Sequence, residues 1–254
     1  MSEHIQISDN GAVREIVFAR PEKKNALSNA MYRAAREALE SAAQDPAVRV
    51  VLFTAQGEAF TAGNDLADFA AVASGQSGAL EALPFIEALA TFEKPIVAAV
   101  PGLAVGIGTT MLLHCDLVFL ADTARLTTPF VDLALVPEAA SSLLLPARIG
   151  HVRAFAMFAL GEALGAEDAL ALGLANRVLP AAEVLPAARQ AAAALAKRPP
   201  GAVQATKRLM RDADALLAQS RAESAMFRER LQSAEAREAF TAFMERRPPD
   251  FSQF

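Results

Sequence analysis

The feature that most constrains the fold of this chain is a set of short, almost wholly apolar segments separated by longer helical patterns. The segments lie at 48–54, 96–100 and 117–121. Compact apolar runs of this length are typical of strands in a sheet that is covered on both faces. Ser28 is placed to cap a helix that stops before Asp45. Strands that alternate with helices predict an α/β fold with crossover connections.

Further patterns predict how the chain is organised around these strands. Residues 5–8 and 13–18 flank Asp9-Asn10-Gly11, a turn sequence that favours a β-hairpin. Helical patterns follow at 68–93 (interrupted at 74–78), 104–114, 191–197, 203–218 and 221–245. Since no strand pattern appears after about residue 190, we predict a core domain over 1–194 and a helical subdomain over 195–254. A chain of 254 residues is long enough for a core that buries an internal site.

The last helical pattern has an apolar face whose role is open. Its members are Met226, Phe227, Leu231, Phe240, Phe243 and Met244. The first interpretation is that this face packs on the protein's own core. The alternative is that it forms a subunit contact or a lid.

Composition and charge exclude several classes of protein. The net charge is −5 without a Lys/Arg-rich run, which argues against a nucleic-acid binder. The single cysteine excludes a disulfide framework and a cysteine-built metal site, and the three histidines show no ligand spacing. No apolar stretch reaches the ~18 residues of a membrane span, and the polar N-terminus lacks a signal core. We therefore expect a soluble cytoplasmic protein.

Two glycine-containing loops are candidates for presenting backbone hydrogen-bond donors. In the loop before Leu66, Gly63 permits a positive φ or a close backbone approach, although an ordinary turn is the alternative. The loop 101–108 follows a strand and opens a helix, whose unpaired N–H groups bind anions or developing oxyanions. This second loop is not a dinucleotide fingerprint, because Gly106-Ile107-Gly108 lacks the third glycine.

Glu138 is a candidate acid or base. It stands in a long stretch of apolar and small residues, 128–146. Burial there would raise the pKa of its carboxyl toward the range useful to a general base. The alternative is a solvent-facing glutamate, or an acid near the start of a helix that Ser141 or Ser142 would cap. Asp132, the nearest other carboxylate, is expected at the surface.

In this order and spacing, the two glycine loops and the stretch 128–146 resemble the crotonase (enoyl-CoA hydratase/isomerase) superfamily, and the resemblance covers nearly the whole chain. The matching motifs are Arg20-Pro-Glu-Lys-Lys-Asn-Ala-Leu27, Ala62-Gly-Asn-Asp-Leu66, Lys94-Pro-Ile-Val-Ala-Ala-Val-Pro-Gly102, Gly106-Ile-Gly108, Cys115-Asp116, Gly161-Glu162 and Ala171-Leu-Gly-Leu-Ala-Asn-Arg-Val178. The resemblance implies an α/β spiral of ββα repeats with a C-terminal helical trimerisation region. It implies a homotrimer or a hexamer, a dimer of trimers. It also implies an acyl-CoA thioester as substrate, with CoA as part of that substrate and no separate cofactor or metal.

The resemblance assigns roles to residues of both glycine loops. The thioester carbonyl would sit between the backbone N–H groups of Asn64 and Ile107, which would stabilise an enolate. Further substrate contacts are implied at Lys24, Ala26, Ala62, Gly63, Asp65, Leu66, Gly106, Thr110 and Phe130. Candidates for CoA phosphate contacts are Lys23, Lys24, Lys207 and Arg208, with an ordinary surface role as the alternative. His114 and Cys115 are expected to be buried in packing, and Asp116 to support the fold through hydrogen bonds.

Two departures from the family pattern bear on the reaction. A hydratase of this family holds its water between two glutamates, and the corresponding positions here are Thr110 and Phe130. Glu138 instead resembles the lone base of the Δ3,Δ2-enoyl-CoA isomerases, with Ala139 in place of their usual glycine. It would remove a proton from C2 and return one at C4, in an apolar pocket that suits an acyl chain. Two alternatives stay open, a hydratase or other crotonase-type enzyme and an inactive acyl-CoA-binding paralogue.

Overall fold

The computed structural model describes residues 2–65, 68 and 80–254, which form two β-sheets surrounded by helices. The six-stranded sheet has the order β1-β2-β3-β5-β7-β10 and the four-stranded sheet the order β4-β6-β8-β9. The strands are β1 (Ile5–Asn10), β2 (Val13–Phe18), β3 (Val50–Ala55), β4 (Ala59–Thr61), β5 (Ile96–Val100), β6 (Leu103–Val105), β7 (Leu117–Ala121), β8 (Arg125–Thr127), β9 (Leu164–Gly165) and β10 (Arg177–Leu179).

Helices follow pairs of strands along the chain. The α-helices are α1 (Asn29–Gln44), α3 (Ala82–Thr91), α4 (Ile107–Thr110), α5 (Ser141–Ile149), α6 (His151–Ala159), α7 (Ala166–Ala171), α8 (Ala181–Ala196), α9 (Pro200–Met210), α10 (Ala213–Leu231) and α11 (Ala234–Glu245). Three short 3-10 helices are η1 (Pro21–Lys23), η2 (Met111–His114) and η3 (Val131–Leu133).

The two sheets are built from one repeating unit. β3, β5 and β7 enter the larger sheet, and each is followed directly by a strand of the smaller sheet, β4, β6 or β8. A helix then leads to the next repeat, so that the repeated strands pair in parallel within each sheet. The pairs β1–β2 and β8–β9 are antiparallel. This arrangement confirms the predicted α/β fold and its spiral of ββα repeats. It also places the ends of β4 and β6 beside each other.

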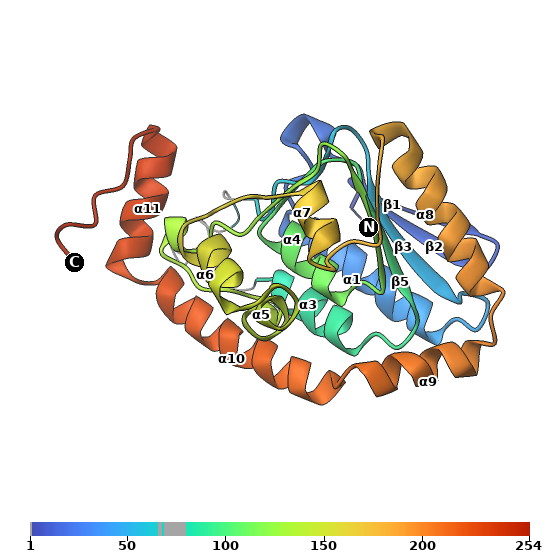
Figure 1. The fold of residues 1–254 in the computed structure, drawn as a ribbon. Coiled ribbons are helices and arrows are strands. Elements are labelled where there is room, and N and C mark those ends of the chain that lie inside the picture. Colours follow the sequence, from blue (N-terminus) through green and yellow to red (C-terminus); the bar gives the residue numbers. More distant parts are fainter. Residues whose placement is uncertain (1, 66–67, 69–79) are drawn as a thin grey trace.

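Helices cover both faces of the larger sheet, as the apolar strands predicted. α8 packs on β3, β5 and β7, while α1 and α3 lie on the other side (Figure 1). The side chains of Val50, Leu52 and Phe53 are fully buried, as is Val100 on the neighbouring strand. Full burial of such a side chain contributes roughly 1.5–3 kcal/mol, so this continuous apolar layer is the main support of the fold.

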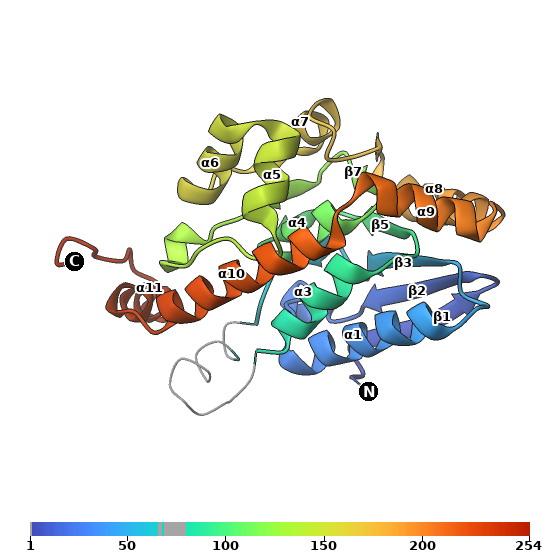
Figure 2. The same ribbon diagram turned by 90° about the horizontal axis from the view of Figure 1, so that it is seen from below.

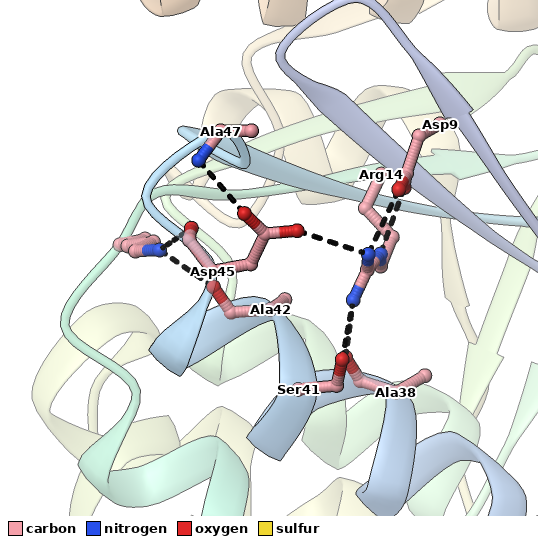
Figure 3. A network of polar contacts seen from close by, with 8 residues as sticks. Asp9, Arg14, Ala38, Ser41, Ala42, Asp45 and Ala47 are labelled. Carbon is pink, nitrogen blue, oxygen red and sulfur yellow. Dashed lines mark hydrogen bonds and ion pairs between the residues drawn. The ribbon is translucent and has the colours of Figure 1, made fainter.

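The predicted hairpin is confirmed and is joined to α1 by a polar network (Figure 3). Arg14 donates two hydrogen bonds to the carboxylate of Asp9, each 2.8 Å long, and a third of 3.0 Å to Ser41 Oγ on α1. Asp45, just beyond α1, lies 3.7 Å from the same guanidinium. These contacts give the buried guanidinium its partners and hold α1 against the hairpin.

Some helix boundaries differ from those expected. The segment 104–114 is not one helix, because Leu103–Val105 pairs with β4 and β8 as a strand. Gly106, with φ 55°, then turns the chain into α4 and η2. Of the helix expected over 68–93, the structure describes α3, whereas 69–79 lie outside the described residues.

The C-terminal helices leave the sheets and run along one side of the molecule. Seen from below, α10 crosses α3 and α5, and α11 lies near the C-terminus beyond it (Figure 2). The expected domain boundary after residue 194 falls in the last turn of α8, which packs on the sheet. Ser233 separates α10 from α11 and caps the latter by accepting the N–H of Ala236 at 3.0 Å.

The apolar face expected on the last helix divides between burial and exposure. Phe227 and Leu231 are buried, and Phe240 packs partly buried on the core, as the first interpretation requires. Met226, Phe243 and Met244 are 55%, 56% and 75% exposed. Within the described part of the chain, none of the helices has the length and apolar character needed to cross a membrane.

Candidate active site

The two glycine loops meet where β4 and β6 end. Gly63 has φ 87°, and a Cβ placed there would lie 3.0 Å from the carbonyl oxygen of Val105 at the end of β6. Only a glycine permits this close approach at little cost. Because β4 and β6 are parallel neighbours, Asn64 and Ile107 follow their strands at the same edge of the sheet.

The backbone at these two positions is suited to presenting N–H groups. Asn64 forms an isolated bridge with Leu27, in which Leu27 donates to Gly63 O at 2.8 Å and Asp65 donates to Leu27 O at 2.9 Å. Successive N–H groups of an extended chain point in opposite directions, so that of Asn64 points away from this bridge. Ile107 is the first residue of α4, where N–H groups lack intrahelical acceptors.

The segment around Lys24 forms one wall of the same region. Asn25 is fully buried, and its amide donates to the carbonyl oxygens of Gln56 and Ala59, both at 2.8 Å. Ala62 donates its N–H to Lys24 O at 2.9 Å. These bonds bring the segment of Lys24 and Ala26 beside Ala62 and Gly63 and leave the side chains of Lys23 and Lys24 exposed.

Asp65 is engaged within the protein. Its carboxylate accepts a 2.6 Å hydrogen bond from Arg20, which also donates to Ala26 O at 3.2 Å. Asp65 therefore helps to hold the Ala26 segment in place. Leu66, the last expected contact of this loop, lies outside the described residues.

Glu138 is buried in the turn between η3 and α5. Glu138 is only 4% exposed, and its Oε1 has no hydrogen-bond partner among the described residues. Burial raises the pKa of Glu138 to about 8, and the negative charge of Glu223 acts in the same direction. The expectation of a buried carboxyl with a raised pKa is thus confirmed, and that of Asp132 at the surface as well.

A threonine and a phenylalanine, neither of which carries a carboxylate, fill the positions at which a hydratase would carry its two glutamates. Phe130 is 5% exposed, and its Cε1 lies 3.9 Å from the place where a Cβ on Gly106 would be. Thr110 is fully buried on α4, and its hydroxyl oxygen has no hydrogen-bond partner in the part of the chain that is described. Leu135 is buried beside them and donates its N–H to Phe130 O at 2.8 Å.

Tyr32 connects Glu138 with the first glycine loop, a role that sequence reasoning missed. Its hydroxyl donates to Asn64 Oδ1 at 2.5 Å. Burial raises the pKa of Tyr32 well above its ordinary value, and the charge of Glu138 adds to this effect. Tyr32 is therefore bonded to Asn64 and lies within electrostatic range of Glu138.

Glu223 on α10 is a second residue that sequence reasoning missed. It accepts hydrogen bonds from the N–H of Ala140 at 2.6 Å, from the N–H of Ser142 at 2.9 Å and from Ser142 Oγ at 2.5 Å. The expected serine cap of α5 is wrong, because the N-cap residue is Ala140 and the hydroxyl of Ser142 donates to Glu223 instead. Some 80 residues separate Glu223 from this turn, and no local pattern marks it.

Lys207 is not available for a CoA phosphate, which corrects one expectation. It is 8% exposed, forms a 2.8 Å ion pair with Asp116 and donates to Lys94 O at 2.9 Å. A buried ammonium needs such partners. Asp116 also accepts the N–H of Ile96 at 2.7 Å, which confirms its expected supporting role. Arg208 is exposed, 3.6 Å from Glu93.

The region combines a buried carboxyl with two backbone N–H groups that follow neighbouring strands. Both oxygens of Glu223 accept hydrogen bonds, whereas Oε1 of Glu138 has no hydrogen-bond partner among the described residues. A carboxyl with a pKa near neutral exchanges protons readily in both directions. Among the described residues, no group of three or more His, Cys, Asp and Glu side chains is arranged to hold a metal ion.

Comparisons with known proteins agree with this geometry. The family model described as Enoyl-CoA hydratase/isomerase matches residues 8–254. The chain is 34% identical to rat Enoyl-CoA delta isomerase 2 over 97% of its own length and 65% of that protein's length. It is 35% identical to a probable enoyl-CoA hydratase of Rhodobacter capsulatus, covering 97% and 96% of the two chains.

Solved structures lead to the same family. An enoyl-CoA hydratase/isomerase from Pseudoalteromonas atlantica T6c is 41% identical and superposes with a TM-score of 0.93, covering 98% of this chain and all of the other. From the fold, the two glycine loops and these matches together, we conclude that the chain belongs to the enoyl-CoA hydratase/isomerase family, the crotonase superfamily.

Proposed function

We propose that this protein is a Δ3,Δ2-enoyl-CoA isomerase whose single base is Glu138. The observation that carries the proposal is the contrast within one site. A buried carboxyl, whose Oε1 has no hydrogen-bond partner in the described part of the chain, stands at the isomerase position, while Thr110 and Phe130 occupy the two positions of a hydratase's glutamates. A water molecule added across a double bond must be held and deprotonated, and these two side chains supply no carboxylate for either task.

The reaction needs one proton shuttle. Ionised Glu138 removes a proton from C2 of a 3-enoyl-CoA, and the electron pair moves into the thioester to form a dienolate. The N–H groups of Asn64 and Ile107 stabilise the negative oxygen. Protonated Glu138 then delivers its proton to C4, which leaves the double bond between C2 and C3. No atoms are gained or lost, and CoA takes part only as a portion of the substrate.

The names of the relatives do not distinguish isomerisation from hydration as the reaction of this chain. The rat relative is an isomerase by name and the Rhodobacter relative a probable hydratase, at almost equal identity. The rat protein is also longer than this chain, which spans 65% of it. The proposal therefore depends on the residues of the site.

The remaining expectations are part of the same proposal. Lys23 and Lys24 are exposed on the wall beside Ala62 and would contact the phosphates of CoA. Phe130 and Leu135 would contact the acyl chain. The cytoplasmic location and the assembly into a homotrimer or hexamer remain predictions from the sequence.

The test is a coupled assay on purified protein with trans-3-hexenoyl-CoA, which follows formation of the trans-2-enoyl-CoA. Glu138→Gln keeps the shape of the side chain and removes the base, so we expect a loss of isomerisation of about a thousandfold. Asp132→Asn is the matched control, because it neutralises an exposed carboxylate six residues earlier in the chain. Crotonyl-CoA hydration is measured in parallel.

Two outcomes would overturn the proposal. Hydration that survives in both the wild type and Glu138→Gln, without isomerisation, would make Glu138 structural and the protein a hydratase. Binding of an enoyl-CoA without turnover by either route would identify an inactive acyl-CoA-binding paralogue.

A further inference from the structure

The peptide group between Ala139 and Ala140, one residue beyond Glu138, is hydrogen-bonded on both sides to buried ionisable residues. The carbonyl of Ala139 contacts His114 Nε2 at 2.7 Å, and the N–H of Ala140 donates to Glu223 Oε2 at 2.6 Å. Both alanines have positive φ, 62° and 54°, a backbone conformation that L-residues rarely adopt unless contacts hold them there. The turn that carries Glu138 therefore depends on these two contacts.

The contact on the carbonyl side comes from a neutral histidine. A carbonyl oxygen can only accept, so Nε2 of His114 carries the hydrogen. Nδ1 is then the acceptor and receives a hydrogen bond from the guanidinium of Arg211, which also donates to His114 O at 3.0 Å. Burial lowers the pKa of His114 to about 3, with the charge of Arg211 acting in the same direction. His114 therefore stays neutral and keeps the same hydrogen bonds near pH 7.

On the N–H side the acceptor is the carboxylate of Glu223, whose surroundings favour the ionised form through hydrogen bonds. Gln219 donates to Ser142 Oγ at 2.8 Å, so the hydroxyl of Ser142 directs its own hydrogen to Glu223. With the N–H groups of Ala140 and Ser142, three donors point at this carboxylate. Burial nevertheless raises the pKa of Glu223, which these hydrogen bonds oppose.

We propose that Glu223 is a positioning residue for Glu138, which fixes the Ala139–Ala140 turn from α10 and presents a like charge to the base. The inference rests on the proposed role of Glu138. Glu223 touches no reacting atom, since both of its oxygens are bonded to the turn. Its position assigns two effects to one residue: it sets where Glu138 lies, and it sets the pH at which Glu138 becomes ionised.

Other charged groups around this pair have fixed partners or no net charge. The titratable and charged groups on the packed elements are Tyr32 on α1, Glu87 on α3 with Arg221 on α10, His114 on η2, Arg148 on α5, and Arg230 on α10 with Glu235 on α11. Of these, Tyr32 and His114 stay neutral near pH 7, because burial raises the pKa of the first and lowers that of the second. The negative charge that acts on Glu138 is that of Glu223.

The experiment compares Glu223→Gln with Glu229→Gln, an exposed glutamate of the same helix. The first readout is the pH profile of kcat/KM for isomerisation, whose acidic limb reports ionisation of the base. Without the like charge, we expect the limb of Glu223→Gln to move to lower pH by about one unit. The plateau at high pH should fall about tenfold to a hundredfold, since a misplaced base costs rate. Glu229→Gln should follow the wild type.

A second readout does not depend on turnover. Glutamate labelled with ¹³C at the carboxyl carbon reports the titration of Glu138 by NMR, and the signal is assigned by its loss in Glu138→Gln. The pKa of Glu138 should fall in Glu223→Gln and stay unchanged in Glu229→Gln. If the protein has no isomerase activity, the proposed function fails while this titration still decides whether Glu223 acts on Glu138.

Glu223→Asp separates the two effects and covers the case in which Glu223→Gln does not fold. It keeps the charge and withdraws the carboxylate by one methylene. We expect an unchanged pKa of Glu138 and a lower plateau of kcat. An unshifted titration in Glu223→Gln, or a kcat in Glu223→Asp equal to that of the wild type, would overturn the proposal.

Discussion

At the scale of the residue, burial and the charge of Glu223 both favour the protonated form of Glu138. The Glu138 carboxyl has an ordinary pKa of 4.5 and a pKa of about 8 in the folded protein. Folding therefore takes up a proton between these two values. The stability that this group contributes is present below pH 4.5 and is lost as the pH rises toward 8.

This linkage predicts a pH dependence of the free energy of unfolding. Relative to Glu138→Gln, which cannot ionise, the wild type should lose about 1.4 kcal/mol per pH unit between pH 5 and 8. Urea unfolding of both proteins at several pH values measures the difference, with Glu229→Gln as the control that should parallel the wild type. Curves for the wild type and Glu138→Gln that stay parallel would show that Glu138 is not buried as described.

Ala139, the neighbour of Glu138, has a backbone conformation that is unusual for alanine. Ala139 stands where the isomerases resembled by this sequence usually have glycine, and its φ is 62°. Glycine adopts this conformation freely, whereas alanine needs surrounding contacts to hold it. Those contacts are the hydrogen bonds to His114 and Glu223 on either side of the Ala139–Ala140 peptide.

At the scale of the element, α9 is attached to the sheet by an ion pair whose lysine is buried. Lys207 of α9 reaches Asp116, at the start of β7, which also accepts the N–H of Ile96 on β5. One carboxylate thus joins two strands and one C-terminal helix. The contact explains why Lys207 is unavailable to a ligand.

Removal of this ammonium should weaken the whole chain. Lys207→Met leaves Asp116 with only part of its partners, and we expect a loss of about 2 kcal/mol in the free energy of unfolding. Arg208→Met is the matched control, because its pair with Glu93 is exposed, and its effect should stay within about 0.5 kcal/mol. Denaturant unfolding measures both variants, and equal small effects would contradict the structural role of Lys207.

At the scale of the whole molecule, large apolar side chains remain uncovered on the single chain. Val152 on α6 is 80% exposed, and Leu209 and Met210 at the end of α9 are 90% and 83% exposed. Exposed apolar groups of this size are a common feature of surfaces between subunits. We therefore propose that these side chains lie in the contacts of the assembly that the family resemblance implies.

The assembly predicts the mass in solution. Light scattering on the purified chain should give three or six times the 26.8 kDa of one copy. Leu209→Glu places a charge in the predicted contact and should lower the mass. A wild-type protein that elutes with the mass of a single chain would contradict the predicted homotrimer or hexamer.

The sequence by itself determined the α/β fold, and its motifs carried the resemblance to a family that implied the ββα repeats. Strands covered on both faces must be apolar throughout, and that pattern is visible in residues that are adjacent in the chain. The glycine loops and Glu138 could be identified for the same reason, because each lies within a short motif. Of the residues in these motifs, Asn64 and Ile107 follow parallel neighbouring strands at one edge of the smaller sheet.

Only the tertiary structure decided what surrounds Glu138. Tyr32, His114 and Glu223 come from helices at distant points of the chain, and nothing near them in the sequence records their contacts. The same holds for Lys207. Its sequence context does not distinguish it from a surface cation, whereas in the folded protein it is buried and paired with Asp116. A motif records local chemistry, whereas burial and the charge of a distant neighbour set the pKa of a buried group, and folding alone brings those neighbours together.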